Sequence, residues 1–242
     1  MFLPLLLFDC DGTLVDSEPL LAEEMAAGLN AAGLPFTTAD YLTKYRGVRF
    51  RHIIKQLQKQ HGHVPARKLK RIDKAMRVKL AQRLATELVP IAGTREALEQ
   101  LIAYPRAVVS NGAAAKIRTA LATTRLDGYF QTALFSGYSV NCWKPEPCLH
   151  LHAARAMGFA PGDCIAIDDA LVGVQAALAA GMTVIHLNRF PRIETTPANA
   201  IMIRHMKELP DVVEQLTRAR HPAPAADDTP ATPLPKAATG GR

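Results

Sequence analysis

Asp9 and Asp11 are two carboxylates separated by one residue, and they follow directly on an apolar run at residues 3–8. Ionised carboxylates are costly to desolvate and unfavourable in strands, so a pair at the end of a buried strand needs compensation. Paired acids of this kind can hold a metal ion, attack an electrophile or transfer a proton. Their chemistry depends on which other polar groups the fold brings beside them.

Three further polar groups lie at comparable places in the sequence. Ser110 and Asn111 follow the apolar run 107–109, Asp168 and Asp169 follow the run 164–167, and Lys144 precedes a Pro and a helical pattern. If the runs are parallel strands of one sheet, these groups share its carboxyl edge, where open α/β folds place their sites. Each group alone is a weak signal, because a strand that ends in Ser-Asn usually just enters a turn.

Four carboxylates at one edge would repel each other unless a cation lies among them. Hard oxygen ligands without a nearby His or Cys favour Mg²⁺, and Lys144 adds positive charge. Such a site suits phosphoryl transfer, in which catalysis consists mainly of positioning and charge stabilisation. The acids at the end of the first run are therefore expected to hold a metal ion and to attack a phosphorus atom.

The elements that must position these groups alternate between two kinds. Strand-like runs occur at 3–8, 107–109, 164–167, 183–187 and 201–203, with helical patterns between most of them, which predicts a doubly wound, Rossmann-like parallel sheet. Residues 16–87 contain only helical stretches and predict an inserted cap domain. We expect a core domain of residues 1–15 and 88–219, and a disordered Pro- and Ala-rich tail at 220–242.

Charge is distributed unevenly along the 242 residues. Of 29 Lys and Arg residues, 14 lie between Tyr41 and Pro90, against two of the 22 acids, so the net charge of +7 comes from this insertion. The basic segment indicates either an anionic ligand or a solvated helical face. It holds few aromatic residues and no nucleic-acid motif, so a small-molecule substrate is expected and nucleic acid is not.

The compartment and the assembly can also be anticipated. The apolar start is too short to span a membrane and lacks the basic flank of a signal peptide, so we expect a cytoplasmic protein without a membrane partner, either a monomer or a small homo-oligomer. The four cysteines, Cys10, Cys142, Cys148 and Cys164, have no CxxC spacing, and reduced thiols are expected.

The ordered segments "DCDGTLVDSE", "VVSNG", "WKPEP" and "IDDALVGVQAALAAGM" resemble the four motifs of the haloacid dehalogenase superfamily, and the helical insertion resembles the cap of its phosphatase and β-phosphoglucomutase branch. The resemblance implies that Asp9 is the nucleophile and that Asp11, oriented by Thr13, is the general acid and base. It also implies that Ser110, Asn111 and Lys144 bind the phosphoryl group. Mg²⁺ would be held by Asp9, the backbone carbonyl of Asp11, and Asp169, with Asp168 in support. Ala170 replaces the Ser that is frequent in the family.

The same resemblance implies that the cap determines which substrate is bound. The segment "YRGVRFRH" is similar to the family's specificity loop, in which Gly47 would permit a tight bend and Arg46 or Arg49 could meet a carboxylate. Lys74 and Arg77 lie on a later cap helix and could reach the same cleft. "LFSGYSVNCWKPEP" is similar to the bacterial members that act on 6-phosphogluconate, so the expected activity is Mg²⁺-dependent hydrolysis of a sugar-acid phosphate. A sugar phosphomutase, or a phosphatase for phosphoglycolate or a hexose phosphate, is the alternative. Thr13 and Leu21 replace the Val and His usual in the mutases, which favours a hydrolase.

Overall fold

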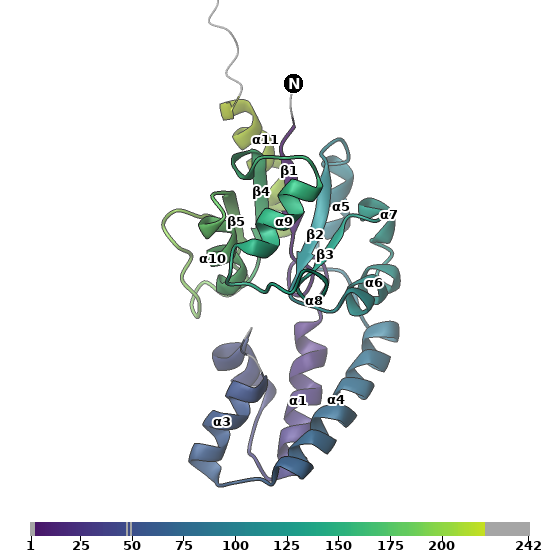
Figure 1. Cartoon of the computed structure of the whole chain (residues 1–242), viewed down its shortest axis with the longest axis vertical. Coiled ribbons are helices and arrows are strands. Elements are labelled where there is room, and N and C mark those ends of the chain that lie inside the picture. Colours follow the sequence, from purple (N-terminus) through teal and green to yellow (C-terminus); the bar gives the residue numbers. More distant parts are fainter. Residues whose placement is uncertain (1–2, 47, 49, 221–242) are drawn as a thin grey trace, which may run out of the picture.

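The computed structural model describes residues 3–46, 48 and 50–220, and it shows a sheet flanked by helices above a second group of helices (Figure 1). The strands run parallel in the order β3-β2-β1-β4-β5-β6. Their bounds are β1 Leu5–Phe8, β2 Arg106–Ser110, β3 Leu134–Ser136, β4 Cys164–Asp168, β5 Thr183–Leu187 and β6 Ile201–Ile203. The predicted fold, a doubly wound parallel sheet with an inserted helical cap, is confirmed.

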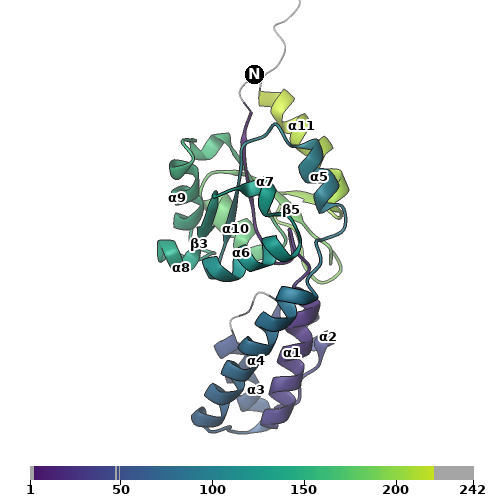
Figure 2. The ribbon, with the colours of Figure 1, turned by 90° about the vertical axis from the view of Figure 1, so that its right-hand side faces the viewer.

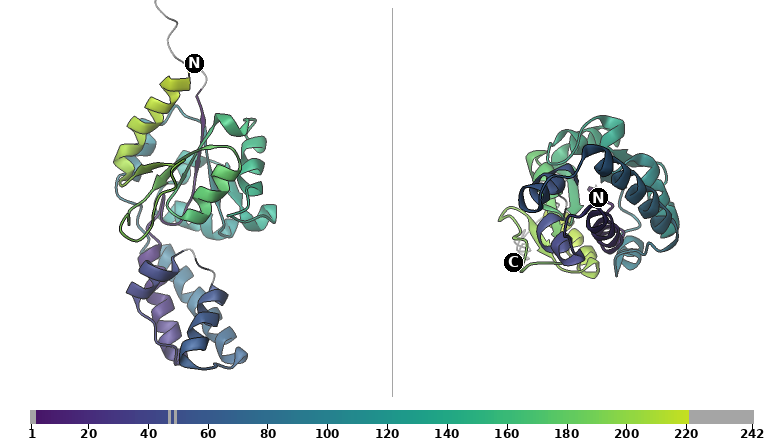
Figure 3. Two further views of the ribbon diagram at one scale, coloured as in Figure 1. Left: turned by 90° about the vertical axis from the view of Figure 1, so that its left-hand side faces the viewer. Right: turned by 90° about the horizontal axis from the view of Figure 1, so that it is seen from below.

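Side chains alternate between the two faces of the sheet, and each face is covered by helices, so β1 is apolar throughout. Leu6 and Phe8 pack with α5 (Thr94–Gln100), α6 (Ala114–Thr123) and α11 (Leu209–Arg220), while Leu5 and Leu7 pack with α9 (Cys148–Ala156) and α10 (Leu171–Ala179). Figure 3 shows these two layers from the side and from below. Two short helices, α7 (Asp127–Phe130) and α8 (Gly137–Val140), flank β3.

Between β1 and α5, the described residues form four helices that do not belong to the layers beside the sheet. They are α1 (Glu18–Ala32), α2 (Thr38–Asp40), α3 (Phe50–His61) and α4 (Ala66–Thr86), with a π-helical turn at Tyr41–Tyr45. Ala22, Met25 and Leu29 recur at helical spacing on α1 and are buried in an apolar cluster of their own with α3 and α4. These helices lie together below the sheet (Figure 2). The boundaries at 15/16 and 87/88 remain predictions.

Several elements differ from the expectation. β3, α6, α7 and α8 were not expected as separate elements: β3, α7 and α8 are short and lie among Gly, Asn and Ser, and α6 has few large apolar residues. Helix α11 extends to Arg220, so the tail that was expected to start there begins no earlier than residue 221, outside the described residues. None of the helices in the described part of the chain combines the length and apolar character needed to cross a bilayer.

The cysteines require a correction. Cys142 and Cys148 form a disulfide bond, whereas Cys10 and Cys164 are free and buried. The expectation of four reduced thiols was therefore wrong for one pair. The reason is that the segment between α8 and α9 turns back on itself, which brings the two Cα atoms to 6.1 Å although six positions separate them in the sequence. Lys144 lies within this closed segment.

Candidate active site

Three neighbouring strands end at the same edge of the sheet and carry the polar groups there. Phe8 of β1 is in register with Val108 of β2 and with Ile167 of β4, so the residues that follow are brought side by side. These residues are Asp9, Ser110, Asn111, Asp168 and Asp169, and together with Asp11 and Lys144 they line a cavity of about 160 Å³. Strand pairing thus gathers groups that are up to 160 positions apart in the sequence.

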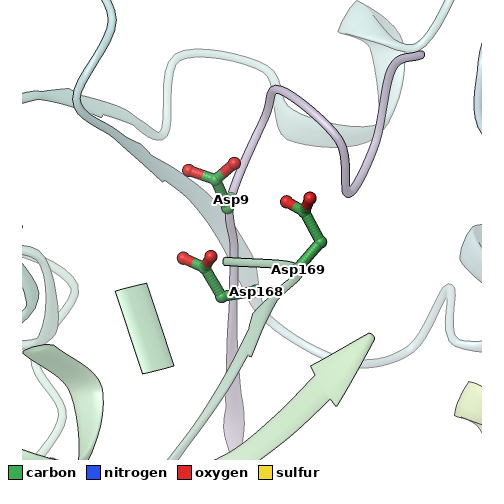
Figure 4. A group of neighbouring side chains, drawn as sticks. All are labelled: Asp9, Asp168 and Asp169. Atoms are coloured by element: carbon green, nitrogen blue, oxygen red, sulfur yellow. The ribbon is translucent and has the colours of Figure 1, made fainter. Parts of the chain in front are cut away.

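Three carboxylates form the centre of this site. Each of Asp9, Asp168 and Asp169 offers an oxygen, and the three oxygens lie within 4.8 Å of one another (Figure 4). Burial, together with the charge of Asp168, raises the pKa of Asp9 to about 7, although Lys144 opposes the shift. Burial and the negative charges of Asp168 and Asp9 raise the pKa of Asp169 well above its ordinary value. A concentration of buried negative charge is therefore incompletely compensated by the side chains.

The donor set fits a hard divalent cation. All three side chains provide carboxylate oxygens, and no His or Cys belongs to the group. Oxygen-only donor sets of this kind suit Mg²⁺ or Ca²⁺ better than Zn²⁺. Asp168 and Asp169, which were both expected at the metal, lie in this cluster with Asp9. The side chain of Asp11 lies outside it, and a role for its backbone carbonyl at the metal stays a prediction.

Lys144 connects two of the carboxylates. Its Nζ donates to Asp9 Oδ1 at 2.6 Å and to Asp168 Oδ2 at 2.6 Å, and the side chain is almost fully buried. Burial acts to lower the pKa of Lys144, but the charges of Asp168 and Asp9 outweigh it and raise the pKa. Asn111 holds the backbone of the lysine, since its Oδ1 accepts a hydrogen bond from the backbone N–H of Lys144 at 2.8 Å. Asn111 therefore also serves to position the lysine.

Asp11 has partners of its own. Lys116 Nζ donates to both carboxylate oxygens at 2.8 and 2.9 Å, and Ser17 Oγ donates to Oδ1 at 2.6 Å. Burial acts to raise the pKa of Asp11, but Lys116 and Ser17 outweigh it and lower the pKa. Thr13, which was expected to orient Asp11, donates to Asp169 Oδ1 at 3.1 Å instead. The turn at residues 10–15 directs its hydroxyl toward β4, so Ser17 takes the place expected for Thr13.

Two glycines allow the acids to approach the backbone. Gly12 has a φ of +86°, which disfavours other residues, and a Cβ there would overlap the carboxylate of Asp169. Gly173, in the first turn of α10, would place a Cβ into the carboxylate of Asp168. Asp168 Oδ1 also accepts from Ala170 N at 3.0 Å, so the residue that replaces the frequent Ser still contributes through its backbone.

Arg46 reaches from the cap into this site. Its guanidinium donates to the backbone oxygen of Asp169 at 3.0 Å, forms an ion pair with Glu194 and lies 4.8 Å from the ring centre of Phe190. Nη1 lies 3.5 Å from Asp169 Oδ2 and is buried without a hydrogen-bond partner among the described residues. Arg46 thus lines the cavity beside the acids, together with Ser110, Asn111 and Lys144.

The other cap residues expected to contact substrate are placed less closely. Gly47 and Arg49 lie outside the described residues. Arg77 is exposed, pairs with Asp73 at 2.9 Å, and lines a cavity of about 600 Å³ between cap and core. Lys74 is exposed and is absent from the lining of the described cavities. Their roles in specificity stay predictions.

Four contributors were not anticipated from the sequence: Ser17, Glu18, Lys116 and Glu194. Lys116 lies in the first turn of α6, which follows β2 at the carboxyl edge, and that position is a usable signal. Glu18 lines both the 160 Å³ cavity and a neighbouring cavity of about 220 Å³. Glu194 lies in the segment after β5, where nothing in the sequence pattern indicates that Arg46 and the amide of Leu171 would meet it.

Comparisons with known proteins point to one group of enzymes. The family model of haloacid dehalogenase-like hydrolases matches residues 3–181. The chain is 32% identical to 6-phosphogluconate phosphatase of Escherichia coli K12 over 206 residues, which cover 85% of this chain and 92% of that protein. It is 30% identical to hexitol phosphatase A of the same organism, over 89% of this chain and 94% of that protein.

Solved structures agree with these sequence matches. A haloacid dehalogenase-like protein of unknown function from Agrobacterium tumefaciens superposes with a TM-score of 0.77 at 27% identity, covering 89% of this chain and 100% of that one. The superposition therefore extends over the sheet and the helical insertion alike.

Proposed function

This chain belongs to the haloacid dehalogenase-like hydrolases and is a phosphoric monoester hydrolase, and on that premise we propose that it hydrolyses a sugar-acid phosphate such as 6-phosphogluconate with Mg²⁺ as cofactor. One observation supports the proposal: Asp9, Asp11 and the buried Lys144 line a single small cavity, where the first two would serve as nucleophile and proton-transfer group. The proposed substrate rests on the similarity to 6-phosphogluconate phosphatase of E. coli, and both E. coli relatives are named as phosphatases.

In the first half-reaction, a carboxylate oxygen of Asp9 attacks phosphorus, and the bond between phosphorus and the ester oxygen breaks. Asp11 donates its proton to that oxygen, and the alcohol leaves. Asp11 is held ionised by Lys116 and Ser17, so it needs a proton before this step. When the phosphate dianion of the substrate binds, Asp11 takes up this proton, because a neighbouring negative charge raises the pKa of a carboxyl group.

In the second half-reaction, Asp11 takes a proton from water, and the water oxygen attacks phosphorus of the aspartyl-phosphate. The bond to Asp9 breaks, and inorganic phosphate and the free carboxylate result. Lys144, Ser110 and Asn111 would hold the phosphoryl oxygens throughout. Asp9, Asp168 and Asp169 would hold Mg²⁺ with the backbone carbonyl of Asp11, and the ion would neutralise the charge on the transferring group.

A phosphate-release assay over a panel of substrates tests the proposal. The panel contains 6-phosphogluconate, glucose 6-phosphate, a hexitol phosphate and phosphoglycolate, each with Mg²⁺ and with EDTA. We expect the highest kcat/KM for 6-phosphogluconate, loss of activity in EDTA, and recovery when Mg²⁺ is returned.

The nucleophile is tested with the same assay. Asp9→Asn should reduce phosphate release to the background rate and keep the circular dichroism spectrum, because the amide retains the shape but cannot attack phosphorus. Turnover near that of the wild type in Asp9→Asn would contradict the mechanism. Interconversion of glucose 1-phosphate and glucose 6-phosphate without net phosphate release would instead identify a mutase.

A further inference from the structure

Glu18 is a buried acid with an unsatisfied oxygen beside the catalytic residues. Its side chain is 8% exposed, and Oε2 has no hydrogen-bond partner within the described part of the chain. The hydroxyl of Tyr41 interacts with its carboxyl group. An unpaired buried carboxylate oxygen costs free energy, so native structures usually provide such an atom with a partner.

The position of Glu18 identifies which part of a substrate it would meet. It lines the 160 Å³ cavity together with Asp9 and Asp11, and it also lines the 220 Å³ cavity that leads toward the cap. The phosphoryl group must contact Asp9, and the ester oxygen must contact Asp11. The leaving group therefore passes Glu18 with the carbon atoms next to the ester oxygen.

A simpler role for Glu18 is to complement the positive end of the α1 dipole, since it is the first residue of that helix. That role does not require a carboxylate oxygen to be buried without a hydrogen-bond partner, because a charge at the surface also interacts with the dipole. The side chain of Glu18 instead faces two cavities, and Ser17, the residue before it, directs its hydroxyl to Asp11. The buried orientation is better explained by a ligand.

We propose that Glu18 accepts a hydrogen bond from a hydroxyl group on the carbon next to the phosphate-bearing carbon, and that it repels substrates with a carboxylate at that place. This inference rests on the phosphatase activity and defines its substrates as phosphorylated polyols and sugar derivatives. In 6-phosphogluconate a hydroxyl occupies this position and the carboxylate lies at the far end. In phosphoglycolate the carboxylate itself occupies this position. Glu18 would therefore favour 6-phosphogluconate over phosphoglycolate.

Three simple esters test the proposal: glycerol 3-phosphate carries the hydroxyl, n-propyl phosphate lacks it, and phosphoglycolate carries a carboxylate there. The ratio of kcat/KM for glycerol 3-phosphate to that for n-propyl phosphate should fall at least about 10-fold in Glu18→Ala, the loss expected for one hydrogen bond to a charged group. The ratio for phosphoglycolate to n-propyl phosphate should rise in Glu18→Gln, because the like charge is gone while the shape is kept. Ratios are used because they cancel any effect on Asp11.

Glu23→Gln is the matched control, since Glu23 is an exposed acid on the same helix, and it should keep both wild-type ratios. The same selectivity can be measured without turnover by calorimetry. The three esters are titrated into Asp9→Asn and into the double variant that also carries Glu18→Ala. If the enzyme binds the three esters with the expected selectivity but does not hydrolyse them, the phosphatase mechanism is wrong. The proposed contact between Glu18 and the substrate hydroxyl is then supported. Unchanged ratios in both Glu18 variants, or no binding of any ester, would overturn the proposal.

Discussion

At the scale of single residues, the site combines acids whose environments differ. Asp9 is buried against other acids, which raises its pKa, whereas Asp11 is paired with Lys116, which lowers its pKa. In a pair that divides these roles the general acid usually has the higher pKa and the nucleophile stays ionised, so a bound cation must lower the pKa of Asp9, and a bound phosphate must raise that of Asp11, before the reaction. Lys116 is the group that creates the difference, because its Nζ contacts both oxygens of Asp11.

Replacing Lys116 tests that assignment. Lys116→Met should lower kcat for alkyl phosphates about 10-fold or more, because Asp11 loses the contact that positions it for both proton transfers. The loss should be smaller for p-nitrophenyl phosphate, whose leaving group needs no proton. Steady-state kinetics on both substrates make the measurement, and Arg118→Met, an exposed cation on the same helix, is the control. Equal kcat in wild type and Lys116→Met would contradict the assignment.

At the scale of elements, the turn after β1 and the start of α10 hold the acids at close range. Gly12 and Gly173 lie against Asp169 and Asp168, so the backbone itself forms one wall of the acidic cluster. The spacing of the motif is therefore a packing requirement as well as a chemical one. A side chain at either glycine would displace a carboxylate.

The cost of such a side chain is measurable. Gly12→Ala should lower the free energy of unfolding by about 2–5 kcal/mol, since it adds the strain of a positive φ to an overlap with Asp169. Gly62→Ala is the matched control: φ there is +97°, and nothing lies within 4 Å of the added Cβ. It should lose only about 1–2 kcal/mol. Urea titrations of the two variants give the free energies of unfolding. Equal losses would show that the carboxylate of Asp169 moves aside without measurable destabilisation.

Much of this arrangement could be predicted from the sequence. The ends of β1, β2 and β4 are marked by acids and by Ser-Asn after apolar runs, and strand pairing then places them together. Glu18 and Glu194 could not be found in this way, because their roles depend on how side chains from a helix and a loop turn toward the edge. For Lys116 the only signal is its place in the first turn of the helix that follows β2. The Cys142–Cys148 bond was missed because it depends on the path of an irregular segment.

At the scale of the whole molecule, burial of neutral histidines makes stability depend on pH. His150 on α9 is 2% exposed, and its Nδ1 lacks a hydrogen-bond partner among the described residues. Burial and the charge of Lys144 lower its pKa well below the ordinary 6.5. Below pH 6.5 the unfolded chain binds a proton at His150 that the folded chain does not, so the contribution of His150 to stability falls as the pH falls.

Between pH 6.5 and 5.5 this single group should reduce the free energy of unfolding by up to about 1.4 kcal/mol per pH unit. His150→Leu should remove that loss, which changes the slope of stability against pH by the same amount. The remaining slope combines His186, whose pKa burial also lowers, with Asp9 and Asp169, whose raised pKa values act in the opposite direction. His61→Leu, on the exposed end of α3, should retain the wild-type slope. Chemical denaturation at several pH values gives the measurement, and an unchanged slope in His150→Leu would refute the assignment.

The contact of Arg46 with Asp169 has a thermodynamic consequence for the enzyme as a whole. The cap places its guanidinium beside a carboxylate of the acidic cluster, so any opening and closing of the cap would involve the same negative charge as uptake of a cation. Two events that share one acceptor are linked, and the linkage is reciprocal. If Arg46 partly neutralises Asp169 when the cap is closed, a closed cap binds the cation more weakly than an open one. A bound cation then shifts the cap toward the open state by the same factor.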